Sequence, residues 1–286
     1  MDHDTQRDRA RTFRALHEDA DGPLVLANAW DVASALVYER LGVAAIGTSS
    51  AGVAASVGYP DGERIPRTET LAAVERMAER VALPVSADIE AGYGDAPGGV
   101  GETVARVVDA GAVGVNLEDG TGDPDRPLRD PADHAARIEA ARAAADDAGV
   151  PIVVNARTDV FWAGVSDPDD RLERAVERAN RYLDAGGDCA FVPGVTDAET
   201  IAALADRIDA PLNVLGGPGA PSVPALGELG VARVSVGSGP MRATLATLEA
   251  IGEELLETGT YDRMADALPY DELADLLADG LARRER

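Results

Sequence analysis

The sequence contains no lysine, because all 26 of its basic residues are arginine. A lysine ε-amine is the nucleophile of Schiff-base aldolases, the anchor of pyridoxal enzymes and a phosphate ligand in P-loop proteins. These three kinds of chemistry are therefore excluded for this chain.

Cysteine and histidine are also scarce. Cys189 is the only cysteine, which excludes an intramolecular disulfide and a cysteine zinc site. It precedes Phe191 in an apolar run, and we interpret it as a core residue rather than a nucleophile. His3, His17 and His134 fall in polar or helix-like stretches, so none is a convincing general base.

Long apolar runs are missing as well. The first residues are charged and lack the apolar core of a signal peptide, and no apolar run reaches the ~18 residues of a membrane span. We therefore expect a cytoplasmic protein.

Positive charge is scarce relative to negative charge. There are 51 acidic residues against the 26 arginines, which gives a formal net charge of -25. A dispersed surplus of this size is typical of a surface that stays soluble at high salt, where screening removes most of the self-repulsion. It indicates a halophilic protein and predicts no nucleic-acid or membrane partner, since phosphate backbones and anionic lipids would be repelled.

The sequence does contain a repeated pattern, in which a short apolar run is followed by a turn and a segment of helical period. Strands that alternate with helices pair in parallel through right-handed crossovers. The pattern predicts an α/β fold, a (β/α)8 TIM barrel, with an open doubly wound sheet as the alternative. The eight apolar runs are Leu24–Trp30, Val43–Ser50, Pro84–Glu90, Val113–Asp119, Pro151–Asp159, Cys189–Gly194, Pro211–Leu215 and Val231–Gly237.

Amphipathic segments between these runs are the expected helices. Asp167 before Pro168 is typical of a helix cap and a first-turn proline, and Gly149 follows a helical segment as a left-handed cap would. We expect a single domain over 1–286, with 241–286 as a C-terminal helical extension. The expected helices are Thr68–Val81, Val100–Ala110, Pro131–Ala148, Asp167–Ala185, Ala198–Ile208, Pro224–Leu229, Met241–Glu257 and Tyr270–Arg284.

Polar residues at the ends of the predicted strands are the candidates for chemistry, because barrel enzymes carry their active sites there. Asp88 and Glu90 lie two apart after a buried run and are expected on the same side of one strand. Glu118 and Asp119 at the next strand end would add negative charge near the same point. An all-oxygen site of this kind suits Mg²⁺ or Mn²⁺.

Arg157 follows the apolar part of the fifth predicted strand. Its guanidinium is expected to project into the barrel mouth, where it can bind a carboxylate or stabilise an enolate oxygen. The alternative is a surface salt bridge. Proton transfer would have to use Tyr59, Tyr93, a carboxylate or water.

Several motifs in order resemble the isocitrate lyase/phosphoenolpyruvate mutase superfamily over roughly residues 20–250. The resemblance implies that Asp88 and Glu90 are the metal-binding acidic pair, supported by Asp61 and Glu118. It also implies that Arg157 contacts the substrate oxyanion. The motifs lie at Asn28–Asp31, Gly47–Gly52, Gly58–Gly62, Ser86–Gly94, Asn116–Asp119 and Asn155–Asp159.

The same resemblance implies further substrate-binding residues and an assembly. Arg157, Glu118 and Tyr59 are the expected catalytic residues, and members of the superfamily commonly form homotetramers, often by exchanging a helix between subunits. The expected substrate-binding residues are Trp30, Ser49, Ser50, Ala51, Gly92, Asn213 and Arg242.

The chain departs from the lyases of this superfamily at the loop after the fourth strand. Those lyases have a Lys-x-Cys-Gly-His loop, whereas Gly120–Pro127 lacks the lysine, the cysteine and the histidine, and the glutamate of the sixth strand is replaced near Pro193. The leading hypothesis is a Mg²⁺-dependent lyase or decarboxylase that cleaves a C–C bond of a small 2-oxo or 2-hydroxy acid through a pyruvate-like enolate. The alternatives are a phosphonopyruvate-type P–C mutase or hydrolase and a barrel that binds an oxo acid without turnover.

Overall fold

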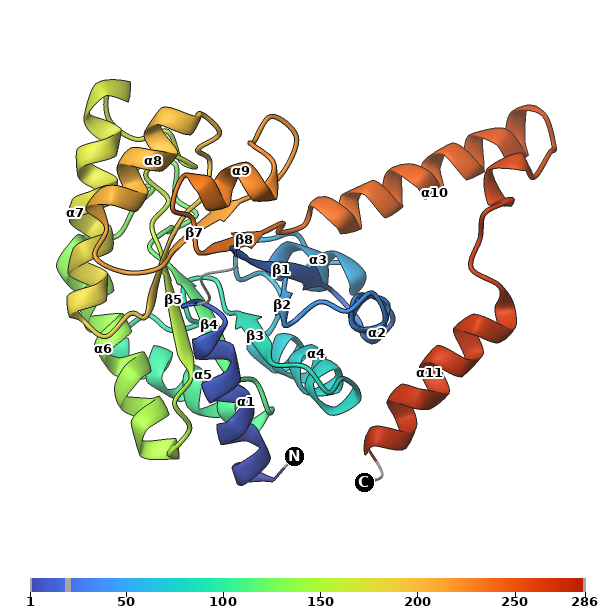
Figure 1. Cartoon of the computed structure of the whole chain (residues 1–286), viewed down its shortest axis with the longest axis horizontal. Coiled ribbons are helices and arrows are strands. Elements are labelled where there is room, and N and C mark those ends of the chain that lie inside the picture. Colours follow the sequence, from blue (N-terminus) through green and yellow to red (C-terminus); the bar gives the residue numbers. More distant parts are fainter. Residues whose placement is uncertain (1, 19–21, 285–286) are drawn as a thin grey trace.

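Eight parallel strands form a closed barrel in the computed structural model, which describes residues 2–18 and 22–284 (Figure 1). The strands follow one another around the barrel in sequence order, and β1 pairs with β8 to close it. The expected (β/α)8 barrel is therefore confirmed and the open sheet is wrong. The strands are β1 (Leu24–Ala29), β2 (Ile46–Thr48), β3 (Val85–Asp88), β4 (Gly114–Glu118), β5 (Val153–Arg157), β6 (Cys189–Val192), β7 (Leu212–Leu215) and β8 (Arg233–Ser235).

Each strand lies within the apolar run predicted for it and is shorter than that run. The change is largest at β2, because Ser49 already caps the following helix and its hydroxyl accepts a hydrogen bond from the Gly52 amide at 3.2 Å. β3 ends at Asp88, so Glu90 lies beyond the strand. This end point decides how the two acids are oriented in the site.

The helices surround the barrel, and a helix is present at each of the eight segments where the sequence predicted one. α6 (Pro131–Ala148) and α11 (Tyr270–Arg284) have the predicted bounds. α7 begins later than expected, because Pro168–Asp170 form a separate 3-10 turn, η1. The Asp167 side chain makes no capping hydrogen bond to this turn. The helices are α1 (His3–Ala15), α2 (Val32–Arg40), α3 (Ser50–Ser56), α4 (Arg67–Arg80), α5 (Pro97–Asp109), α6 (Pro131–Ala148), α7 (Arg171–Asp184), α8 (Ala198–Arg207), α9 (Val223–Glu228), α10 (Gly239–Glu257) and α11 (Tyr270–Arg284), with a second 3-10 turn η2 (Asp262–Met264).

α1 closes the N-terminal end of the barrel. A Cβ on Gly114 would lie 2.7 Å from the Phe13 ring, and the Arg233 guanidinium lies 6.0 Å from the centre of the same ring. Gly114 and Arg233 are the first residues of β4 and β8, so Phe13 fills the bottom of the barrel.

Apolar packing is concentrated between the strands and the helices. On β4, Val115 and Leu117 belong to a core cluster that includes Val104 of α5 and Ile138 of α6, while Asn116 between them faces the barrel interior. Strand alternation thus gives the barrel an apolar outer surface and a polar interior.

The chain after β8 leaves the barrel. Figure 1 shows α10 extending away from it, with Met241 near its start buried and Leu245 and Leu248 exposed. α11 returns to pack on α2 and α4, where a Cβ on Gly280 would lie 2.9 Å from Leu36.

These two helices form the expected C-terminal extension, of which residues 285 and 286 lie outside the described residues. Among the helices of residues 2–18 and 22–284, none combines the length and apolar character needed to cross a membrane.

Candidate active site

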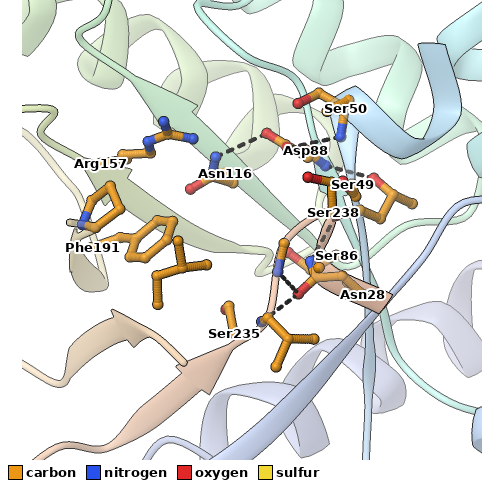
Figure 2. A pocket seen from close by; sticks show the side chains of 18 of the residues that line it. Asn28, Ser49, Ser50, Ser86, Asp88, Asn116, Arg157, Phe191, Ser235 and Ser238 are labelled. Carbon is orange, nitrogen blue, oxygen red and sulfur yellow. Dashed lines mark hydrogen bonds between the residues drawn. The ribbon is translucent and has the colours of Figure 1, made fainter. Parts of the chain in front are cut away.

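A cavity of about 140 Å³ lies at the C-terminal end of the barrel (Figure 2). A cavity of about 150 Å³ holds a benzene molecule, so this one suits a small acid better than a nucleotide. All eight strands contribute to its lining, which includes Asn28, Thr48, Asp88, Asn116, Arg157, Phe191, Leu215 and Ser235.

Asp88 forms the acidic wall of the cavity together with Asp61. The Asp88 carboxylate accepts hydrogen bonds from the Ser50 amide and from the Asn116 side chain, both at 2.9 Å (Figure 2). Burial raises the pKa of Asp61, and the charge of Asp88 raises it further, while a hydrogen bond from Ser50 opposes the shift. Two carboxylates that repel each other on one cavity wall are a suitable place for a cation.

Glu90 does not share the position of Asp88, and the expectation that alternation along one strand aligns the two side chains is wrong. Glu90 has a φ of 51°, and its carboxylate accepts the amides of Gly62 and Glu63 at 2.8 and 2.6 Å and the Tyr93 hydroxyl at 3.0 Å. Burial, followed by the charge of Asp88, raises the pKa of Glu90 to about 7. Glu90 therefore fixes the loop that carries Asp61 to the end of β3.

Arg157 lines the cavity at the end of β5, as predicted. Its Nη1 lies 2.8 Å from Glu118, its Nε lies 2.6 Å from Asp159, and its guanidinium lies 5.6 Å from the centre of the Phe191 ring. Burial opposes the charge of Arg157, but Glu118 and Asp159 outweigh it and raise the arginine's pKa. Arg157 is thus not in a surface salt bridge, the alternative given above, because ion pairs that are largely buried hold its guanidinium at the cavity.

Asp119 points away from the cavity, contrary to the expectation that it adds charge beside Glu118. Its carboxylate is fully buried and accepts hydrogen bonds from Thr158 at 2.8 Å, Arg178 at 2.9 Å and Tyr182 at 2.8 Å. Adjacent residues at a strand end face opposite sides, so Glu118 faces the interior and Asp119 joins β4 to α7.

Ser49, Ser50 and Ala51 line the cavity as expected. The amides of Ser49 and Ser50 are already used, by the Ala29 carbonyl and by Asp88 respectively. The amide of Gly52 is used by the Ser49 hydroxyl. This segment therefore offers fewer free amides to a substrate than a simple oxyanion turn would.

The wall formed by β8 and the start of α10 carries two arginines, Arg233 and Arg242. Arg242 was expected here. Arg233 was not expected, because it is the first residue of β8, and the sequence analysis took only polar residues at the C-terminal ends of strands as candidates. Asn28, from the first matched motif, accepts the amides of Val236 and Gly237 at 2.8 and 2.9 Å and so fixes this wall.

Six expected residues do not line the cavity, namely Glu90 and Glu118, described above, and Trp30, Tyr59, Gly92 and Asn213. Trp30 packs beside α3, Tyr59 is 36% exposed, and Gly92 has a φ of 98° in a space closed by Val100. Asn213 is buried in the barrel interior and donates a hydrogen bond to Ser235 at 3.1 Å. The structure thus gives Trp30, Gly92 and Asn213 packing roles, and the catalytic role of Tyr59 stays a prediction.

Cys189, His17 and His134 are buried away from the reactive wall. Burial raises the pKa of Cys189 to about 12 and lowers the pKa of each of the two histidines to about 4. The cysteine is therefore a protonated core residue at neutral pH, as its apolar neighbours predicted, and the histidines are neutral.

Comparison with known proteins identifies the family. The profile described as phosphoenolpyruvate phosphomutase matches residues 13–256. The chain belongs to this family. An uncharacterised protein of Mycobacterium tuberculosis is 39% identical over 269 residues, which cover 94% of this chain and 96% of the relative.

Two relatives of named activity are more distant. A 2-methylisocitrate lyase of Aeropyrum pernix is 31% identical over 255 residues, 86% of this chain and 79% of the relative. An oxaloacetate decarboxylase of Paraburkholderia xenovorans is 32% identical over 266 residues, 90% of this chain and 84% of the relative. The predicted membership of the isocitrate lyase/phosphoenolpyruvate mutase superfamily, whose members include C–C lyases and mutases, is thereby confirmed.

Solved structures of the superfamily share the fold. A Burkholderia cenocepacia protein that is assigned only provisionally as a lyase or mutase is 38% identical, with a TM-score of 0.90 over 96% of this chain and 97% of the other. A phosphonopyruvate hydrolase determined with oxalate and Mg²⁺ is 24% identical, with a TM-score of 0.83 over 96% of both chains.

The loop after β4, which departs from the lyase pattern, is a compact turn. Gly120 bridges to Leu128, and Thr121 bonds to the Pro127 and Arg126 carbonyls at 3.0 and 2.5 Å. None of the residues of this loop, all of which are described, lines the cavity. It supplies no acid or base there.

The acidic wall fits the Mg²⁺ that superfamily members generally use. Within the described part of the chain, no three acidic, histidine or cysteine side chains converge as a preformed cage. Mg²⁺ typically keeps several waters and binds one or two carboxylates, which is the set that Asp88 and Asp61 offer.

Proposed function

We propose that this chain is a Mg²⁺-dependent decarboxylase or lyase that cleaves a C–C bond of a small 2-oxo or 2-hydroxy acid through a pyruvate-like enolate. The observation that carries the proposal is the pairing of two opposed groups in one small cavity, with Asp88 and Asp61 on one wall and Arg157 on another. This arrangement provides a cation site next to a fixed hydrogen-bond donor for a developing oxyanion.

Asp88 and Asp61 are the residues that would hold Mg²⁺, or Mn²⁺ in its place. When bound, the ion supplies Lewis-acid polarisation of the 2-oxo group. Glu90 acts through the loop, because its bonds to Gly62 and Glu63 position Asp61. Glu118 acts through Arg157, which it contacts at 2.8 Å.

Arg157 is prepared to stabilise negative charge on oxygen. A guanidinium has five N–H groups, and contacts with Glu118 and Asp159 occupy three of them. The remaining two can face the cavity, and the carboxylates keep their direction fixed before substrate arrives. A donor that needs no reorganisation during the reaction gives the largest electrostatic benefit.

Decarboxylation is the favoured branch, because the cavity provides few proton-transfer groups. Among its lining residues, all within the described part of the chain, there is no lysine, histidine, cysteine or tyrosine. Loss of CO₂ leaves the bonding electron pair as an enolate, so no base is needed to start the reaction. The enolate carbon then needs one proton, which water can donate. Cleavage of a 2-hydroxy acid would instead need a base to remove the hydroxyl proton.

The proposal is tested by NMR analysis of purified protein with Mg²⁺ at molar salt, because the net charge of -25 leads us to propose a salt-adapted enzyme. The panel contains oxaloacetate, malate-type acids and phosphonopyruvate. Asp88→Asn is the matched control, since free Mg²⁺ also promotes loss of CO₂ from oxaloacetate. Turnover above this control with release of pyruvate and CO₂ is expected.

Release of phosphate from phosphonopyruvate would instead indicate P–C chemistry. Binding of an acid without Mg²⁺-dependent turnover on the whole panel would contradict the enzymatic proposal and favour a binding barrel.

We also propose that the chain assembles into a homo-oligomer, a tetramer by the superfamily resemblance, through its C-terminal helices. Leu245, Leu248 and Leu256 of α10 are 51%, 62% and 90% exposed, which is unusual for three leucines of one helix. Light scattering at molar salt should give a multiple of the 29.6 kDa chain mass. A monomer at all protein concentrations would refute this assembly.

A further inference from the structure

Arg233 is a buried cation that forms no ion pair with any carboxylate of residues 2–18 and 22–284. It is 3% exposed, its Nη1 has no hydrogen-bond partner, and its Nε donates to the Ser235 hydroxyl at 3.2 Å. Its guanidinium lies over the Phe13 ring, which contributes only a weak attraction compared with a salt bridge. Burial lowers the pKa of Arg233 to about 10, so the group remains charged at neutral pH.

The two other buried arginines of the described residues are satisfied, whereas single nitrogens of the partly buried Arg9, Arg80 and Arg129 also lack partners. Arg137 donates to the carbonyls of Gly94 and Asp95 at 2.7 and 2.8 Å, and Arg178 contacts Asp119 at 2.9 Å. An unpaired buried charge costs much free energy, and an apolar side chain of similar volume would serve packing better. Arg233 therefore has no adequate structural explanation within the barrel.

Arg233 lies at the closed end of the cavity already described. It lines this cavity together with Ser86 and Ser235, one layer above the Phe13 plug. In the view of Figure 2, Ser235 and Ser86 lie below Asp88 and Asn116. Asp88 is near enough to raise the pKa of Arg233 but makes no ion pair with it. The cavity thus has a carboxylate wall at its mouth and a cationic floor.

We propose that Arg233 is a specificity-determining residue that binds a second carboxylate of the substrate at the cavity floor. The inference rests on the proposed function and narrows its substrate class, because a cationic floor would favour dicarboxylic acids over monocarboxylic acids of the same length. An incoming carboxylate would supply the counter-charge that the described residues do not provide, and Ser86 and Ser235 line the cavity beside Arg233.

The test is direct binding, measured by titration calorimetry with Mg²⁺ at one fixed salt concentration. The probes are malate and 2-hydroxybutyrate, which differ by replacement of the distal carboxylate with a methyl group. Arg233→Met removes the charge at similar volume, and Arg233→Gln keeps a polar group. Cys189→Ala is the matched control, because it changes a neutral side chain buried within the same barrel.

Wild-type protein and Cys189→Ala are expected to bind malate about tenfold or more tightly than 2-hydroxybutyrate, as expected for a charge-assisted contact. Both Arg233 variants should lose this preference while their affinity for 2-hydroxybutyrate changes less than about threefold. Ligand-free Arg233→Met should melt no lower than wild type, since no native ion pair is broken.

Three results would overturn the inference. The first is a wild-type protein that does not bind malate more tightly than 2-hydroxybutyrate. The second is a folded Arg233→Met that keeps this preference. The third is an equal loss of affinity for both acids in the Arg233 variants. These results are separable from the catalytic proposal. If the preference for malate depends on Arg233 but no acid is turned over, only the enzymatic proposal is refuted. If an acid is turned over but the Arg233 variants keep the preference for malate, only the proposed carboxylate site at the cavity floor is refuted.

Discussion

Replacement of Arg157 by alanine is the sharpest test of its proposed catalytic role, because the side chain lies between the cavity and two buried carboxylates. Its side chain is 16% exposed, and it contacts Glu118 at 2.8 Å and Asp159 at 2.6 Å. Removing one charged stabilising group from a dry site costs roughly 3 kcal/mol, which is about two to three powers of ten in rate. Turnover should fall by this factor and the Michaelis constant should rise.

The same substitution also damages the fold, and the structure sets the size of that effect. Arg157→Ala leaves Glu118 and Asp159 buried without their cation, and breaking a buried ion pair costs about 3–5 kcal/mol against a typical total of roughly 5–15 kcal/mol. Burial already raises the pKa of both carboxyls, despite Arg157. A raised folded-state pKa means that protonation relieves the cost, so the variant should be most stable at low pH and lose stability as pH rises above the carboxyls' unfolded values.

Arg157→Lys separates the two effects. It keeps the positive charge near Glu118 and Asp159, so the melting temperature should fall less than in Arg157→Ala. A lysine cannot reproduce the planar fork, so turnover should remain low. The assays are steady-state kinetics on the acid found in the NMR panel, together with thermal melts by circular dichroism. Near-normal turnover in a folded Arg157→Ala would exclude the catalytic role and leave Arg157 as a salt-bridge partner alone.

Three other substitutions address the metal site, the thiol and a buried histidine. Asp88→Asn should abolish Mg²⁺-dependent turnover while the fold persists, because it removes charge but keeps shape, and unchanged Mg²⁺ dependence in kinetic titrations would remove Asp88 from the metal site. Cys189→Ala should retain most activity, since burial keeps this thiol protonated with a pKa of about 12, and full loss of turnover in a folded variant would give the thiol a chemical role. His134→Phe should reduce the loss of folding stability that occurs as pH falls below neutral. Burial lowers the pKa of His134 to about 4, so the unfolded chain takes up a proton first and stability falls as pH drops from about 6.5 toward 4. This histidine alone accounts for about 2 kcal/mol between pH 8 and pH 5, measurable by urea unfolding, and the exposed His3→Phe serves as control. An unchanged pH slope in His134→Phe would contradict the reasoning.

The barrel could be predicted because its strands and most of its helices carry strong local patterns. β5 combines a continuous apolar run with a polar end, and α6 starts with a capping Asp130 before proline and ends at Gly149 in a left-handed conformation. α1 was missed because its buried residues, Gln6, Ala10 and Phe13, form a narrow stripe among charged neighbours. Its position depends on the barrel end that it fills, which no local pattern contains.

The site was predicted correctly where a side chain belongs to a regular strand. Arg157 and Asp88 end β5 and β3, and both line the cavity. Glu90 was placed wrongly because the backbone turns to a φ of 51° beyond the strand, where alternation no longer applies. Arg233 was missed because it is the first residue of β8. The role of a side chain at this position depends on the residues that face it across the barrel, which the local sequence does not show.

The polar barrel interior explains how so few groups at the mouth can be held in working positions. Asn155 donates to Asn116 at 2.9 Å, and Asn116 donates to Asp88 at 2.9 Å, so a chain of amides runs from the interior to the acidic wall. The second Asp88 oxygen accepts the Ser50 amide, and the Asp88 amide donates to the Thr48 hydroxyl at 2.8 Å. Each bond restricts the carboxylate before any cation or substrate binds. An apolar interior would pack more stably, but it would leave Asp88 free to rotate, and an imprecisely held group loses much of its catalytic benefit. Asn155, which does not line the cavity, therefore belongs to its function as much as Asn116, which does.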